Sequence, residues 1–116
     1  MEIRLIGIKK APFTLCLLAM TAHAEISQER MTHCANVGTT YQLAADLRNS
    51  HASPQQALNS ISGFGSKDAG MTIEFKKKVI NQVYFDPRFT YAGGHALYQQ
   101  MFNLCAYPEG IYKPLK

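Results

Sequence analysis

The feature that most constrains the fold of this chain is a pair of cysteines, Cys34 and Cys105, which lie far apart in the sequence. Each one falls near the centre of the apolar face of a predicted helix. The third cysteine, Cys16, lies in an amino-terminal segment that we expect to be removed. Because exported proteins meet an oxidising environment, the two remaining thiols are expected to pair. The sequence therefore predicts a disulfide between the first and the last long helix.

The first residues of the chain are typical of a secretory signal peptide. Three basic residues precede an apolar stretch at 11–20, and Ala22-His23-Ala24 then supplies the small residues that signal peptidase recognises. A helix that spans a bilayer needs roughly 20 apolar residues, so this stretch is too short to do so. We therefore expect residues 1–24 to be cleaved and residues 25–116 to form a single periplasmic or secreted domain without membrane insertion.

Basic residues are not concentrated in the predicted domain. The whole chain has a formal net charge of +4, but three of its cations belong to the predicted signal peptide. The remaining basic run, Lys76-Lys77-Lys78, is typical of a solvated helix face. Binding driven by phosphate neutralisation requires a concentrated basic surface, so we expect no nucleic-acid partner.

The pattern of apolar residues predicts an all-α fold. These residues recur at helical spacing, and the alternating β-branched runs that are typical of strands are absent. Ser27 is a candidate N-cap, Ser53-Pro54-Gln55-Gln56 has the pattern of a capping box, and Pro87 predicts a helix end just before it. Four helices are expected, at about 27–48, 53–63, 66–85 and 90–107. We predict a small four-helix bundle that is cross-linked by one disulfide.

Helical projection gives each predicted helix an inner face. The face around Cys34 comprises Met31, Val37, Gly38, Tyr41, Ala44 and Ala45, and the face around Cys105 comprises Tyr91, Gly94, Leu97, Tyr98, Met101, Phe102 and Leu104. The apolar arc of the third helix exceeds half of its circumference, which predicts contact with two neighbouring helices.

Two other roles for Cys34 are weaker than the disulfide. His33 precedes it directly, but adjacent helical residues point about 100° apart, so His33 is badly placed to activate a thiol. No C-x-x-C or C-x-x-C-H motif is present, and the histidines lack the paired spacing of a zinc site. We therefore expect no metal, no cofactor and no catalytic cysteine.

A disulfide that closes a loop from residue 34 to residue 105 stabilises a fold by about 4 kcal/mol on the chain-entropy model.

A possible ligand site combines Lys76, Asp86 and His95. A histidine with a nearby carboxylate can act as a general acid or base, but no nucleophile, oxyanion motif or phosphate loop accompanies this pair. Lys76 falls inside the apolar arc of its helix. We expect its stem to cover apolar surface while its ammonium group stays in water, and a buried ion pair or a ligand contact is the alternative.

A possible partner surface comprises two apolar groups, whose members are either exposed or part of the core. Leu43 and Leu47 form an i, i+4 pair opposite Cys34. Aromatic residues gather around the turn before the last helix and near the carboxyl terminus, and they include Phe85, Phe89, Tyr91 and Tyr107. Exposed apolar patches and surface aromatics are typical of protein interfaces.

The order of these features resembles that of small exported helical proteins of proteobacteria. The matching pieces are a signal peptide, Cys34 in the first helix, the S-P-x-x-A-L helix at 53–58, the V-Y-x-x-P turn at 83–87 and Cys105 in the last helix. At the level of architecture the chain is also similar to periplasmic acid-stress chaperones and to helical immunity proteins. The resemblance implies an exported helical scaffold and assigns a role to no residue.

The leading hypothesis is a non-enzymatic module that binds another protein, as an inhibitor, an immunity protein or a stress chaperone does. It accounts for a cross-linked scaffold with many aromatics and no catalytic constellation. The alternative is an enzyme or small-ligand carrier with a pocket near Lys76, Asp86 and His95. A structural component of the cell envelope is a third hypothesis.

Overall fold

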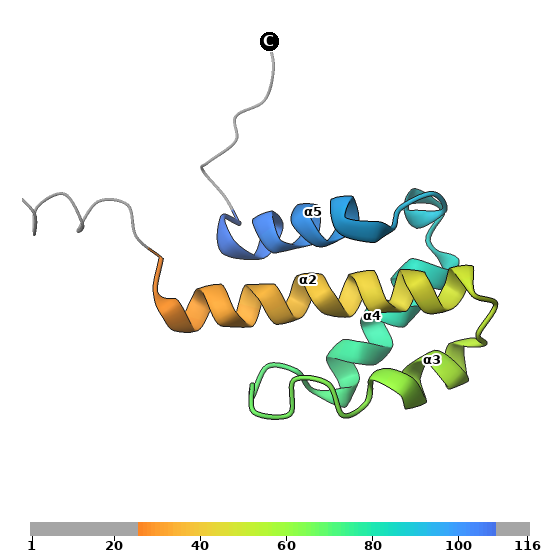
Figure 1. The fold of residues 1–116 in the computed structure, drawn as a ribbon, viewed down its shortest axis with the longest axis horizontal. Helices are drawn as coiled ribbons and strands as arrows, with labels where there is room; N and C mark the ends of the chain where they lie inside the picture. The colour runs from red at the N-terminus through yellow and green to blue at the C-terminus, as the bar shows by residue number, and fades with distance from the viewer. Residues whose placement is uncertain (1–25, 109–116) are drawn as a thin grey trace, which may run out of the picture.

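The computed structural model describes residues 26–108, and Figure 1 shows how they are arranged. These residues form four α-helices and one short 3-10 helix, and they contain no strand. The α-helices are α2 (Gln28–Asn49), α3 (Pro54–Ile61), α4 (Ile73–Phe85) and α5 (Gly94–Ala106), and the 3-10 helix η1 spans Pro87–Phe89. The predicted all-α class is confirmed for this part of the chain, whereas the predicted signal segment, 1–24, lies outside it.

Side-chain caps fix where three of the helices begin. The Ser27 hydroxyl accepts a backbone N–H in the first turn of α2. Ser53 takes part in both hydrogen bonds of a capping box at α3, and Thr72 caps α4. These bonds satisfy N–H groups that a helix end otherwise leaves unpaired. The predicted starts of α2 and α3 are confirmed, and α4 ends at Phe85 as expected.

Two helices begin later than predicted. Helix α4 begins at Ile73 rather than near residue 66, because Asp68 bonds to side chains of α2 and residues 66–72 form turns. Helix α5 begins at Gly94 rather than near residue 90, because η1 and a turn intervene. The φ of Gly94 is +61°, a left-handed conformation that glycine adopts easily and that marks a break rather than a helix interior.

Helix α2 is the centre of the described structure. Helix α5 packs along one side of it, and α3 and α4 lie on another, as Figure 1 shows. Helix α4 contacts both α2 and α3, which confirms the two neighbours predicted from its wide apolar arc. No Cα atom of α5 lies within 8 Å of α3 or α4. The predicted four-helix bundle is therefore not confirmed.

The core lies between α2 and the helices around it. Its buried apolar members include Val37, Tyr41, Ala44 and Ala45 of α2, Ala57 and Ile61 of α3, Met71 just before α4, Val79, Ile80 and Val83 of α4, and Leu97 of α5. Four residues of the predicted inner faces are instead exposed, namely Met31, Tyr91, Gly94 and Leu104. Tyr91 precedes α5, so its helical projection does not apply, and Leu104 lies on a helix that packs against α2 alone among the described helices.

Lys76 lies on the inner side of α4, but its ammonium group is not in water. Only 2% of the residue is exposed, and Nζ donates to the carbonyl oxygens of Ser62 and Phe64 at 2.9 and 2.7 Å. These carbonyls follow the end of α3, where a helix leaves acceptors without partners. The predicted solvated ammonium is therefore wrong, because Lys76 ties α4 to the end of α3.

Candidate functional site

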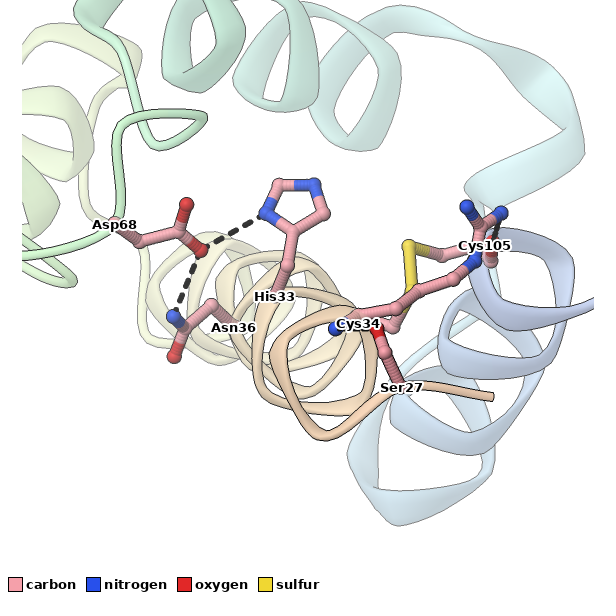
Figure 2. The surroundings of a disulfide bond; sticks show 7 residues. Ser27, His33, Cys34, Asn36, Asp68 and Cys105 are labelled. Atoms are coloured by element: carbon pink, nitrogen blue, oxygen red, sulfur yellow. Dashed lines mark hydrogen bonds and ion pairs between the residues drawn. A yellow bond between two sulfur atoms is a disulfide. The ribbon is translucent and has the colours of Figure 1, made fainter. Parts of the chain in front are cut away.

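The disulfide between Cys34 and Cys105 joins α2 to α5, as Figure 2 shows. The two Cα atoms are 5.4 Å apart across 71 residues of sequence. Cys34 is fully buried, and Arg30 donates from its guanidinium to the Cys105 carbonyl oxygen at 2.8 Å. The predicted disulfide is confirmed, and it leaves no free thiol among residues 26–108.

His33 points away from the disulfide and toward the turn that precedes α4 (Figure 2). Its Nδ1 lies 2.8 Å from Asp68 Oδ2, and the amide of Asn36 donates to the same oxygen at 3.0 Å. The backbone N–H of Gly70 donates to Asp68 Oδ1 at 2.9 Å. Three donors from two separate segments therefore surround one carboxylate.

These contacts lower the pKa of Asp68 below its ordinary value. The hydrogen bond from Asn36 is the largest cause, and the bonds from His33 and Gly70 act in the same direction, against the opposing effect of burial. Because the carboxylate stays ionised at neutral pH, it acts as an acceptor and the Nδ1 of His33 carries the hydrogen. The remaining ring nitrogen, Nε2, makes no hydrogen bond to any described residue.

A groove of about 880 Å³ opens beside this pair, between the first half of α2 and the turns before α4. We call it the His33 groove. Its lining includes Glu29, Arg30, His33, Asn36, Lys67 and Asp68. Both basic and acidic side chains therefore reach the groove.

The sequence did not predict this groove. Asp68 falls within a segment that the sequence predicts to be helical, and the partners of its side chain lie 32 and 35 residues away. One local signal was present, because an aspartate two residues before a glycine often forms a turn through its side chain. The bond from the Gly70 N–H to Asp68 is a turn of this kind.

The structure does not bring Lys76, Asp86 and His95 into one pocket. The Lys76 ammonium binds carbonyls beside α3, whereas Asp86 follows the other end of α4 and pairs with Arg88 at 2.7 Å. Ten residues of helix separate Lys76 from Asp86, or about 15 Å along the axis. His95 is exposed on α5, where it stacks on Tyr98. Among residues 26–108, no group of three or more His, Cys, Asp or Glu side chains is placed to hold a metal ion.

The predicted partner surface divides into packed and exposed residues. Leu43, Leu47 and Phe89 are half-buried and pack against the core, and Phe89 stacks on Tyr41 with a centroid distance of 5.9 Å. Tyr107 is also half-buried. The exposed members of the set are Phe85, with 68% of its surface accessible, and Tyr91, with 99%.

Phe85 and Tyr91 stand on either side of η1, and we call this region the aromatic corner. A hollow of about 280 Å³ adjoins it, lined in part by Phe85, Pro87 and Thr90. The backbone beneath is held by Arg48, whose guanidinium donates to three carbonyl oxygens in and after α4, those of Val83, Phe89 and Ala92, at 2.7 to 2.9 Å. The two aromatic rings therefore project from a fixed turn.

Comparison with known proteins does not place this chain in a family. No family model matches the chain, and neither does any curated protein or solved structure. None of the helices in residues 26–108 combines the length and the apolar character that a membrane span requires.

Proposed function

We propose that this chain is an exported, disulfide-linked helical module that binds another protein through the aromatic corner. The observation that carries the proposal is the exposure of Phe85 and Tyr91 on either side of η1, where Phe85 also lines a hollow in the surface. Aromatic side chains bury a large area with little loss of conformational entropy, and they dominate the binding energy of many interfaces.

The way the corner is held supports a binding role. Arg48 bonds to carbonyls on both sides of η1, and the Tyr84 hydroxyl donates to the Ala52 carbonyl at 2.7 Å. A partner that docks on Phe85 and Tyr91 would therefore meet a preorganised turn. Preorganisation reduces the free energy that association costs.

The place of the chain in the cell is part of the same proposal. A disulfide is typical of oxidising compartments, which agrees with the predicted signal peptide. An inhibitor, an immunity protein or a stress chaperone would each use a small cross-linked scaffold with an exposed apolar corner. We therefore place the partner in the periplasm or outside the cell.

The proposal is tested by comparing what three immobilised, oxidised proteins retain from an extract of exported proteins. The three are the wild type, the double variant Phe85→Ser/Tyr91→Ser and the control Ile73→Ser. Ile73 is a suitable control because it is also an exposed apolar residue, with 39% of its surface accessible, at the opposite end of α4. Quantitative mass spectrometry then measures each retained protein.

We expect at least one protein that the wild type and Ile73→Ser retain equally and that the double variant loses. Circular dichroism must show that all three proteins are folded. If every retained protein binds the double variant as well as it binds the wild type, the aromatic corner is not the binding surface.

A further inference from the structure

The His33 groove lies away from the aromatic corner, and a ligand could bind in it independently. His33 and Arg48 line the two hollows and lie 15 residues apart on α2, which corresponds to about 22 Å of helix. A protein that docks at the aromatic corner would not contact the polar side chains of the His33 groove. Their arrangement is that of a separate ligand site.

The histidine is built into a fixed orientation. Asp68 holds Nδ1, and Asp68 is itself held by Asn36 and Gly70. Gly70 also makes room for the ring, because a Cβ atom at this position would lie 2.6 Å from His33 Cε1. A carboxylate that holds one ring nitrogen of a histidine fixes its tautomer and aims the other nitrogen at a ligand. Figure 2 shows Nε2 on the side of the ring opposite Asp68.

The charges that line the groove determine which ligand Nε2 can bind. Arg30 and Lys67 bring two cations, and Glu29 and Asp68 bring two anions. The Asp68 carboxylate is already satisfied by three donors, so it competes little for the cations. When the ring of His33 is protonated, cations exceed anions and Nε2 becomes a donor.

We propose that the His33 groove binds a small anionic group, a carboxylate or a phosphate, with the Nε2–H of protonated His33 as its central donor. Lys67 and Arg30 line the same groove and add positive charge, although the Arg30 guanidinium also donates to the Cys105 carbonyl oxygen. Binding is accordingly tighter when the ring of His33 is protonated than when it is neutral, because only the protonated ring donates from Nε2 while Nδ1 donates to Asp68.

The experiment follows the histidine Cε1–H signals of the oxidised full chain by NMR. Inorganic phosphate and acetate are titrated separately, at about pH 5.5 and about pH 8, and sodium chloride holds the ionic strength constant. His95 is the internal reference, since it is exposed on α5 and does not line the groove. We expect a saturable shift of the His33 signal at the lower pH and a much weaker one at the higher pH.

Two lysine variants separate the groove from general surface charge. Lys67→Gln removes a cation that lines the groove and leaves the pair of His33 and Asp68 intact, and it should weaken binding by a factor of about three to ten. Lys78→Gln removes an exposed cation of α4 outside the groove and should leave affinity unchanged.

The two anions identify the source of the ligand group. Saturation by phosphate alone assigns the site to phosphorylated ligands, and saturation by acetate alone assigns it to carboxylates. If the His33 signal follows both anions no more than the His95 signal does, or if the two lysine variants bind equally, the groove is not an anion site. Neither result depends on the aromatic corner.

Discussion

Gly38 of α2 is in direct contact with Tyr98 of α5, so that a Cβ atom added to Gly38 would lie 2.8 Å from the Tyr98 carbonyl oxygen. It would also lie 2.7 Å from Tyr98 Cδ1. A side-chain ring can rotate away, but the carbonyl is part of the α5 backbone, and seven residues beyond it, at Cys105, helix α5 is bonded to Cys34 of α2. The two helices can approach this closely only because residue 38 has no side chain.

Gly38→Ala is therefore expected to destabilise the protein, even though alanine is the better helix former. Forcing a methyl group into a packed contact costs about 1 to 3 kcal/mol, which exceeds the gain of about 1 kcal/mol from helix propensity. The free energy of unfolding, measured by denaturant titration of the oxidised protein, should fall. Gly63→Ala is the control, because nothing lies within 4 Å of its added Cβ and its φ is not positive. Equal stability of Gly38→Ala and the wild type would contradict the close contact.

Arg48→Met is expected to lower the free energy of unfolding by about 3 kcal/mol. Methionine keeps most of the apolar stem but removes the donors to three carbonyl oxygens, and each partly buried acceptor left unpaired costs about 1 kcal/mol or more. Arg88→Met is the matched control, since Arg88 is exposed and pairs only with the carboxylate of Asp86. Its midpoint of unfolding should stay close to that of the wild type. Similar midpoints for the two variants would show that Arg48 does not hold the turn.

The stability that Asp68 provides should disappear in acid. Its folded-state pKa is lowered, first by the Asn36 bond, so its contribution is complete above the ordinary carboxyl pKa of about 3.9 and is lost as pH falls through the lower folded value. We expect Asp68→Asn to be less stable than the wild type near neutral pH and the difference to shrink below about pH 4. Denaturant titrations across this range measure the difference. Asp86, whose pKa is also lowered, titrates in both proteins and cancels. A difference that stays constant with pH would contradict the role of Asp68.

Replacement of both cysteines by alanine should lower the free energy of unfolding by about 4 kcal/mol, as expected for a cross-link across 71 residues. Helix α5 should be affected most, because among the described helices it packs against α2 alone. Hydrogen exchange should therefore show faster opening of α5 than of α4. Uniform loss of protection in both helices would show that α5 does not depend on the disulfide for its position.

The features that the sequence predicted correctly are those with a local cause. The starts of α2 and α3 follow from Ser27 and Ser53, whose side chains bond within their own first turns. The disulfide followed from the absence of any other thiol in the predicted domain, together with the position of each cysteine on its apolar face. Neither inference required knowledge of how the helices pack.

The features that were predicted incorrectly depend on contacts between distant segments. Helical projection placed Lys76 inside an apolar arc, but only the packed structure shows that the end of α3 supplies acceptors for its ammonium group. Asp68 was assigned to a helix because its bonds to His33 and Asn36 cannot be read from its neighbours in sequence. The His33 groove is formed by these contacts, so no local pattern could predict it.

The exposure of an aromatic side chain is also a property of the tertiary structure. Phe85, Phe89 and Tyr91 lie within seven residues, and the sequence left open which of them are in the core. Phe89 stacks on Tyr41, whereas Phe85 and Tyr91 are exposed because η1 turns the chain between them. The aromatic corner could be suspected from the sequence but not delimited.

The central claim is that Cys34 and Cys105 form one covalent link that positions α5 on α2 and leaves no described thiol for chemistry. Peptide mapping of the protein purified without reductant, after alkylation, tests this most directly. The account predicts a single cross-linked species that joins the peptide of Cys34 to the peptide of Cys105, with neither residue alkylated. Recovery of both peptides in alkylated, unlinked form from folded protein would contradict it.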